Sequence, residues 1–381
     1  MREGEEESVK PLELFFDLVF VLALTQCTAL MAEDPTWGGL ARGLLVLGVL
    51  WWAWVGYAWL TSVIDPEEGP VRLVMFAVMA AFLVCALCVP GAFDDAALTF
   101  ALAYGFVRFG QIALFEIASR EHPELRSSVH GLAASTAVGV GLILIASGLD
   151  NAAQGAVWAL AITLDAAGPY FFGQDGWKLV PSHFAERHGL IVIIALGESI
   201  VAIGAGVTGE ITTAVVAAAA LGTIVAAALW WLYFDIVALV AERRLTNAEV
   251  GHEQNGIARD SYSYLHFPMV AGIVLVALGM KKTIGDTGDP LKLVPAVAML
   301  GGMAAYLLAH VAFRMRNVHR FSAARLITAV VFLALIPLAT EVDSLVTLAI
   351  VSAVSIGLVA FETVRYAELR DKMRHQLAES Q

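Results

Sequence analysis

The sequence is short of charge and of cysteine. Only 15% of its 381 residues are Asp, Glu, Lys or Arg, whereas a soluble domain carries about 25%. The three cysteines, Cys27, Cys85 and Cys88, are too few for a disulfide scaffold in a chain of this length. The formal net charge is -12, which argues against nucleic acid as a partner because phosphate binding needs a concentrated basic surface.

Apolar residues make up 59% of the chain, and the mean hydropathy is +0.75. A bilayer core of about 30 Å needs about 20 mostly apolar residues per helix. Twelve runs fit, at roughly 12–31, 38–61, 71–89, 96–118, 130–148, 152–172, 187–207, 212–240, 261–280, 293–312, 322–340 and 345–363. The sequence therefore predicts an all-α integral membrane protein with about twelve transmembrane helices, whose first partner is the lipid bilayer.

Lysine and arginine are sorted toward one predicted side of the membrane. With a cytoplasmic N-terminus, eighteen of the 23 fall on the cytoplasmic side, namely Arg2, Lys10, Arg72, Arg120, Arg126, Lys178, Arg187, Arg243, Arg244, Arg259, Arg314, Arg316, Arg320, Arg325, Arg365, Arg370, Lys372 and Arg374. Only Arg42, Lys281, Lys282 and Lys292 fall opposite. The positive-inside rule then places both termini in the cytoplasm. Residues 1–10 are acidic where a signal peptide is basic, so the first helix is expected to remain as a span.

The two halves of the chain resemble each other in the order of their motifs. Phe76–Leu87 aligns without a gap to Phe267–Leu278, and Leu18–Leu24 aligns to Leu190–Leu196. Trp51-Trp52 matches Trp230-Trp231, and the pair Tyr104 and Arg108 matches Tyr306 and His310 at the same spacing. These matches predict a six-plus-six internal repeat, with residues 1–175 as the first six-helix repeat and 176–381 as the second. A site would then lie between the halves.

Ionisable groups at bilayer depth are costly, so they tend to face a partner or a cavity. Glu13 and Asp17 lie four residues apart and share one helix face. Arg108 is in mid-span, so it is predicted to pair with a buried carboxylate. The carboxylates available to it are Asp17, Asp165, Glu198, Asp235 and Glu362.

The stretch 182–199 is the most informative in the chain. His183, Arg187 and Glu198 fall near one helical face, while Ser182 is a plausible N-cap with Glu186 in the first turn. The repeat alignment pairs Glu198 with Gln26. The residues predicted to line an ion or solute path are Glu13, Asp17, Gln26, Arg108, Asp165, His183, Glu186, Arg187, Glu198, Asp235 and His310.

Each of these residues also has a simpler reading. A buried Arg with its carboxylate can serve only to fix helix packing, an Asp near a helix end can be interfacial, and a deep His can make a simple interhelical hydrogen bond. Several familiar chemistries are absent from the sequence: no H-E-x-x-H zinc helix and no P-loop occur. We therefore expect no catalytic residue, metal or cofactor. Trp51, Trp52, Trp54 and Trp59 are interpreted as an aromatic belt at the membrane interface.

Several of these motifs resemble the bacterial low temperature requirement protein A family. They are Glu13–Phe20, Trp51–Trp54, Asp65-Pro66, Ser182–Arg187 and Leu196–Ser199. The resemblance covers nearly the whole chain and implies a multi-spanning protein of the bacterial inner membrane. It implies no settled substrate or mechanism. The family usually has an aromatic residue where His188 stands in this sequence.

The first helix has a second likeness. Phe16–Thr25 is similar to the Phe-Ser-Asp first helix of lysosomal and bacterial potassium channels built from six-helix repeats, in which the first helix of each repeat lines the pore. The second copy departs from this pattern, because Gly189 stands at the place aligned with Asp17.

The leading hypothesis is a transporter or channel for an ion or small solute, and not an enzyme. Spans one and seven would line its path, with Asp17, Gln26 and Glu198 as polar contacts and Arg108 as their partner or gate. One alternative is a membrane-embedded enzyme that acts on a lipid, with Glu198 or His183 as acid or base. Another is a non-catalytic membrane sensor or assembly factor. The transported species stays unknown, and association into a homo-oligomer is left open.

Overall fold

The computed structural model describes residues 8–172, 176–207, 209–368 and 370. These residues form helices, with no β-strand among them. The chain divides into two compact units. The first comprises the described residues up to Ile194 together with Leu245–Phe267, and the second comprises Ala195–Arg244 together with the described residues from Pro268 onward. Helix α7 and helix α11 each pass from one unit into the other.

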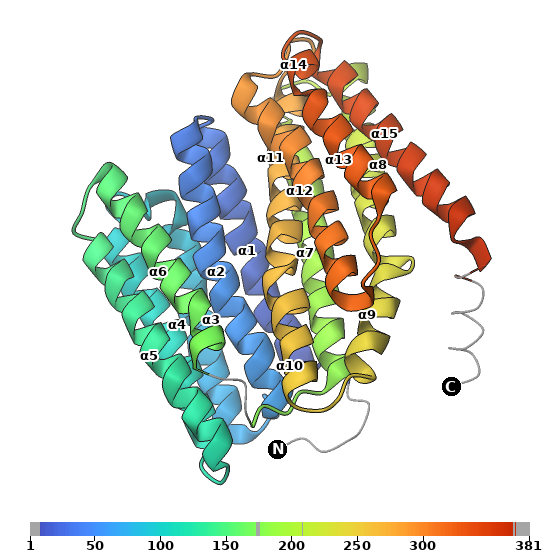
Figure 1. The fold of residues 1–381 in the computed structure, drawn as a ribbon. Helices are drawn as coiled ribbons and strands as arrows, with labels where there is room; N and C mark the ends of the chain where they lie inside the picture. The colour runs from blue at the N-terminus through green and yellow to red at the C-terminus, as the bar shows by residue number, and fades with distance from the viewer. Residues whose placement is uncertain (1–7, 173–175, 208, 369, 371–381) are drawn as a thin grey trace. The chain divides into compact units, whose positions relative to one another are not determined.

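The first unit is built around helix α2, which packs against α1, α4 and α6. Its α-helices, labelled in Figure 1, are α1 (Pro11–Glu33), α2 (Trp37–Val63), α3 (Gly69–Cys88), α4 (Ala97–Ala118), α5 (Pro123–Ala146), α6 (Asn151–Phe171), the first part of α7 (Pro181–Gly206) and α10 (His252–Ile257). It also contains the 3-10 turn η1 (Val89–Gly91) and the π-helix η2 (Ala258–Tyr264). Among helices that follow each other in the sequence, α5 packs most extensively against α6, and α3 against α4.

The second unit contains the rest of α7 and the helices that follow it outside the 245–267 segment. They are α8 (Thr213–Phe234), most of α9 (Val237–Thr246), most of α11 (His266–Gly285), α12 (Leu293–Val318), α13 (Ala323–Ala334), α14 (Ile336–Ala339) and α15 (Ser344–Arg365). Helix α12 packs against α13, and α15 packs against α8. Residues at the C-terminal ends of α8, α12 and α15 line one pocket of the unit.

Local sequence explains where several helices begin. Pro11, Pro123 and Pro181 open α1, α5 and α7, where a proline has no intrahelical hydrogen bond to lose. Thr36 caps α2 by accepting a hydrogen bond from the backbone N–H of Gly39 at 3.2 Å. Such caps satisfy donors that the first helical turn leaves free.

Ten helical segments of the described residues are long and apolar enough to cross a membrane. All twelve predicted spans fall on helices, but α6 is not among the ten, and α13 has only 12 residues. The prediction of an all-α membrane protein is therefore confirmed, while the count of twelve spans stays a prediction. The predicted eighth span, 212–240, corresponds to one candidate span, Thr213–Thr246. A turn at residues 235–236 interrupts its helix between α8 and α9.

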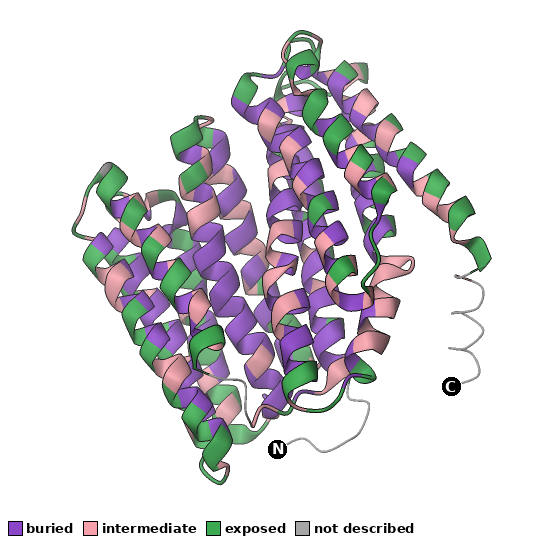
Figure 2. Ribbon diagram, in the orientation of Figure 1, coloured by how far each residue is buried: buried purple, intermediate pink, exposed green. Residues whose placement is uncertain are grey.

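Burial corrects the interpretation of the tryptophans in α2. Trp51, Trp52 and Trp54 are buried, and Trp54 is completely enclosed, as the purple colour of the middle of α2 in Figure 2 reflects. An aromatic belt faces the membrane interface, so the belt prediction was wrong for these three residues. The physical reason is that α2 is the central helix of its unit, which the hydrophobic pattern of a single helix does not reveal.

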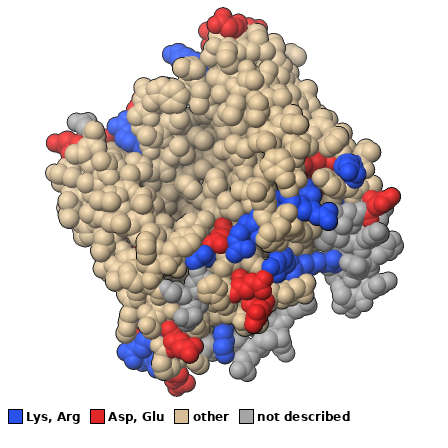
Figure 3. Space-filling model, in the orientation of Figure 1, with Lys and Arg blue, Asp and Glu red and all other residues tan. Residues whose placement is uncertain are grey.

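The surface is mostly uncharged, as Figure 3 shows for one face of the molecule. Large apolar side chains such as Leu102 on α4 and Val364 on α15 are exposed, which lipid contact explains. Two arginines in the positive-inside count, Arg187 and Arg325, are instead buried within helices. They carry no weight for orientation, and the cytoplasmic location of both termini stays a prediction. Arg2, Lys372 and Arg374 lie outside the described residues.

The two compact units do not test the predicted six-plus-six repeat. The units are defined by which residues contact one another, whereas a repeat is defined by similarity between two segments of the chain. The first unit also includes Leu245–Phe267, which lies in the predicted second repeat. The boundaries 1–175 and 176–381 therefore stay a prediction.

Candidate functional site

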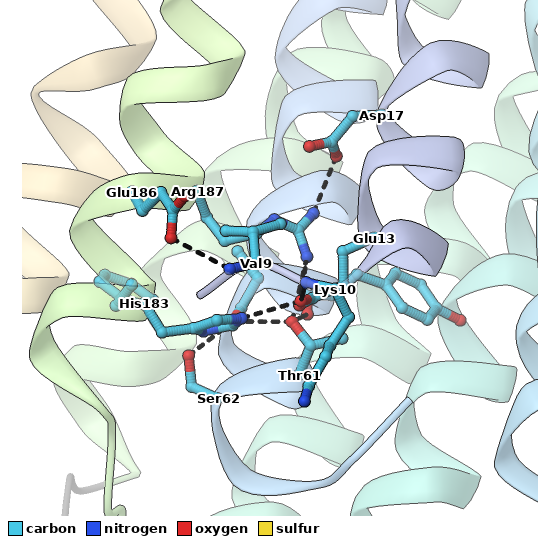
Figure 4. Close-up of polar contacts among 12 residues, drawn as sticks. Val9, Lys10, Glu13, Asp17, Thr61, Ser62, His183, Glu186 and Arg187 are labelled. Carbon is cyan, nitrogen blue, oxygen red and sulfur yellow. Dashed lines mark hydrogen bonds and ion pairs between the residues drawn. The ribbon is translucent and has the colours of Figure 1, made fainter. Parts of the chain in front are cut away.

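The first polar cluster joins α1 to the start of α7 (Figure 4). Arg187 donates from Nη1 to Oε1 of Glu13 at 2.9 Å and from Nη2 to Oδ1 of Asp17 at 2.8 Å. His183 contacts the other oxygen of Glu13, with 2.8 Å between Nε2 and Oε2. The predicted face of His183 and Arg187 therefore meets the predicted face of Glu13 and Asp17. We call these four residues the first-helix network.

The first-helix network is sealed from solvent. Its four side chains are exposed by 1% or less. Thr61 accepts a hydrogen bond from Arg187 Nη1 at 3.1 Å, and Trp54 Nε1 donates to Oδ1 of Asp17 at 2.8 Å. These contacts from α2 add to the network, in which Asp17 Oδ2, His183 Nδ1 and Arg187 Nε have no hydrogen-bond partner among the described residues. Breaking such a pair by removing one partner destabilises a protein by about 3–5 kcal/mol.

Next to this network, His188 lies in an aromatic enclosure. Its ring centroid is 4.5 Å from that of Phe184, 5.1 Å from that of Trp54 and 5.2 Å from that of Tyr262. Its Nδ1 is 2.9 Å from the backbone oxygen of Phe184. Another aromatic ring would fit the same surroundings.

The second polar cluster surrounds Arg108 in the middle of α4. Arg108 Nη2 donates to both oxygens of Asp165, at 3.0 and 2.9 Å. Nη1 donates to Oε1 of Gln111 at 2.8 Å, and Nη2 also reaches Oγ1 of Thr136 at 2.8 Å. The prediction that Arg108 pairs with a buried carboxylate is confirmed. Of the five carboxylates that the sequence offered, its partner is Asp165. Arg108 makes no contact with Asp17 among the described residues, which corrects the idea that the two are partners.

Arg108 and Gln111 line a cavity of about 70 Å³ inside the first unit. By the measure of about 10–15 Å³ per water molecule, it has room for about five waters or a solute of similar size. Its lining comes from α2, α4, α5, α6, α10 and η2, and includes no residue of α1 or α7. Arg108 Nε, like Arg187 Nε, has no hydrogen-bond partner among the described residues. A buried donor of that kind calls for a polar partner.

The wall of the cavity is aromatic and is held by the η2 segment. Trp52, Trp59 and Trp177 line it. Trp59 Nε1 donates to Oγ of Ser263 at 2.9 Å, and the backbone oxygen of Ser263 accepts from Trp51 Nε1 at 2.9 Å. The π-helical turn η2 thus ties the 252–267 segment to α2. Turns of this type occur frequently at functional sites.

The remaining predicted site residues lie elsewhere. Glu198 is buried, in the part of α7 that belongs to the second unit. His310 is buried in the same unit and contacts Arg325, with 2.8 Å between His310 Nδ1 and Arg325 Nη1. Asp235 accepts from Arg370 Nε at 2.9 Å. Gln26 is half-buried in α1, and Glu186 is exposed and accepts from the backbone N–H of Val9 at 3.0 Å.

Sequence reasoning therefore found the charged members of both clusters but not their neighbours. Thr61, Thr136 and Trp54 complete the contacts, and a lone Thr or Trp in an apolar helix gives no signal of that role. Arg259 was counted as a loop cation, yet it lines the cavity beside Asp260. It lies in a stretch, residues 246–263, that is mostly polar, so nothing in the sequence singles out Arg259. Among the described residues, no group of three or more His, Cys, Asp or Glu is arranged to hold a metal ion.

Comparison with known proteins agrees with the resemblance of the motifs. The family model described as "Bacterial low temperature requirement A protein (LtrA)" matches residues 8–360. The uncharacterized protein RA0937 of Rhizobium meliloti (strain 1021) is 31% identical over 311 residues, which are 77% of this chain and 74% of that protein. No solved structure matches the chain. The chain belongs to the bacterial low temperature requirement A protein family and is a multi-span membrane protein.

Proposed function

We propose that this protein is a transporter for a small polar solute, and that the solute binds in the cavity lined by Arg108 and Gln111. The observation that carries the proposal is a fully buried arginine, midway along α4, that lines this cavity. A charge at such depth is costly and marks a solute or ion path by default.

The lining of the cavity indicates the chemistry of the solute. Arg108 and Gln111 are buried and offer hydrogen-bond donors among its lining residues, which also include Trp52, Trp59 and Trp177. Sites for small molecules combine a mostly apolar lining with a few placed polar groups that fix orientation. We therefore propose a solute of a few heavy atoms with an acceptor or anionic end for Arg108 and a flat or apolar part for the tryptophans.

Each polar residue of the cluster has a distinct role in this proposal. Arg108 binds the acceptor end of the solute. Asp165 holds the guanidinium with both of its oxygens, and such two-point pairing fixes the orientation of an arginine. Gln111 ties the guanidinium to the next turn of α4. The path then follows α2, α4, α5 and α6 in place of α1 and α7, which the sequence favoured.

The first-helix network supports the alternatives less well. His183 is completely buried, contacts Glu13 and does not line the cavity, so an acid or base role toward a lipid substrate has little geometric support. We propose instead that the network fixes α1 against α7. The same proposal keeps the protein in the bacterial inner membrane with both termini cytoplasmic, and without catalytic activity.

Uptake into proteoliposomes tests the proposal. Purified protein would be screened for thermal stabilisation by a panel of small carboxylates, amino acids, amides and inorganic ions, and each stabilising solute would then be tested for uptake. We expect at least one solute to be taken up faster than by protein-free liposomes. Gln111→Leu should reduce that uptake because it removes a polar group from the cavity.

Glu116→Gln is the matched control. Glu116 lies on the same helix but contacts His130 at 3.0 Å near the surface, outside the cavity lining. Its uptake should equal that of the wild type. No uptake of any panel solute, or equal uptake by the wild type and Gln111→Leu, would overturn the proposal.

A further inference from the structure

A second and larger pocket lies wholly within the second unit. It has a volume of about 330 Å³ and is lined by residues of α8, α9, α12, α13 and α15. It shares no residue with the Arg108 cavity, and the proposed transport function does not use it. We propose that this pocket binds an anionic phospholipid, with its phosphate on Arg314 and Arg320 and its acyl chains along the apolar wall.

The charges around the pocket leave two arginines unneutralised. Glu362 forms an ion pair with Arg325, which donates from Nη2 to Oε2 at 2.7 Å and from Nε to Oε1 at 2.8 Å. Asp235 forms an ion pair with Arg370, whose Nε donates to Oδ1 at 2.9 Å. Both carboxylates that line the pocket are thus already paired with arginine.

Arg314 and Arg320 line the same pocket, and neither has a carboxylate partner among the described residues. Arg314 donates instead to the hydroxyl of Tyr366 at 3.1 Å, and Arg320 is exposed. With Arg370 counted as the partner of Asp235, the charged residues of the pocket carry an excess of two positive charges. Arginine binds phosphate oxygens well because its planar fork presents two parallel donors.

The rest of the pocket is apolar, which favours a lipid over a soluble phosphate. On α9, Val237, Val240 and Ala241 line it, and their spacing places them on one helix face. Arg243 and Arg244 occupy the last turn of the same helix. A short helix with one apolar face and a basic end is typical of the membrane interface.

The location of the pocket fits the headgroup level of a bilayer. It lies where the spans α8, α12 and α15 end, because its lining residues Asp235, Val318 and Tyr366 come at or just after those ends. The positive-inside rule assigns these ends to the cytoplasmic side, where anionic lipids attract clusters of basic residues. Basic pockets between spans on that side are known to hold anionic headgroups.

Native mass spectrometry of the detergent-solubilised full chain tests the proposal. Phosphatidylglycerol and phosphatidylcholine with identical acyl chains are titrated separately. We expect phosphatidylglycerol to bind with clear preference, and Arg314→Gln with Arg320→Gln to weaken it by at least about tenfold. Arg320→Lys alone should keep most of the binding, because it keeps the charge.

A second pair of substitutions controls for loss of net charge. Arg72→Gln with Arg120→Gln removes two exposed arginines from the first unit and should leave phosphatidylglycerol binding unchanged. Thermal unfolding confirms that each variant is folded. Equal binding of the two lipids, equal weakening by the control pair, or displacement of the lipid by millimolar glycerol phosphate would overturn the proposal. Uptake by the Arg108 cavity is measured separately, so failure of either proposal leaves the other standing.

Discussion

Two arginines of the first unit, Arg187 and Arg108, look alike in chemistry and differ in surroundings. Each is fully buried, pairs with carboxylate oxygens at about 3 Å and contacts a threonine hydroxyl. Arg187 lies in a sealed network, whereas Arg108 lines a cavity. Burial of a charge is therefore not enough to separate the two arginines, whereas the cavity at Arg108 does separate them. We propose that Arg187 serves helix packing and that Arg108 serves binding.

The largest expected effect distinguishes the two arginines by stability. Arg187→Met leaves two buried carboxylates, Glu13 and Asp17, without their cation. We expect a loss of about 3–5 kcal/mol, seen as a large fall in the thermal unfolding temperature in detergent. Arg108→Met leaves one buried carboxylate, Asp165, without its cation and should lose less.

Neutralising the partners provides the control for the Arg187 variant. Adding Glu13→Gln and Asp17→Asn to Arg187→Met removes the uncompensated charges, so much of the lost stability should return. A single Arg187→Met variant as stable as the wild type would contradict the description of the first-helix network as a structural unit.

An intermediate effect on stability is expected at Gly56, which lines the cavity. A Cβ atom at Gly56 would lie 2.2 Å from Nε2 of Gln111, so Gly56→Ala must displace the Gln111 side chain. Overpacking of this kind costs about 1–3 kcal/mol. We expect Gly56→Ala to unfold at a somewhat lower temperature and to lose solute uptake more than stability. Gly141→Ala, with nothing near the added Cβ, is the matched control and should change neither property.

The smallest effect is expected beside the sealed network. His188→Phe keeps an aromatic ring among Phe184, Trp54 and Tyr262, and volume-conserving swaps cost less than about 1.5 kcal/mol. The unfolding temperature should change little, whereas His188→Ala should lower it clearly. A large loss in His188→Phe would show that the imidazole makes an essential polar contact there.

Much of the fold followed from the sequence, because lipid imposes a length and a composition on each span. The i and i+4 spacing of Glu13 with Asp17, and of His183 with Arg187, also placed each pair on one face. That the two faces meet, and that Arg108 selects Asp165, depends on which helices are neighbours. A single sequence read by periodicity does not supply that information.

The role of α2 was hidden for the same reason. Its tryptophans read as a belt, but tertiary packing places them inside the unit and on the cavity wall. The sequence also misplaced Arg325, which it assigned to the cytoplasmic surface. It is near a span end in sequence, yet its contacts with Glu362 and His310 bury it. Position along the chain indicates depth in the membrane and leaves open which side a residue faces.

Thiol accessibility tests the central distinction most directly. After Cys27→Ala, Cys85→Ala and Cys88→Ala remove all native thiols, one cysteine is introduced by either Gln111→Cys or Thr61→Cys. Each folded protein is treated with methanethiosulfonate ethylammonium, and labelling over time is followed by mass spectrometry. Labelling at position 111 in the folded protein, and at position 61 only after denaturation, is the predicted result. Equal labelling at both positions, or labelling at 61 alone, would contradict the account.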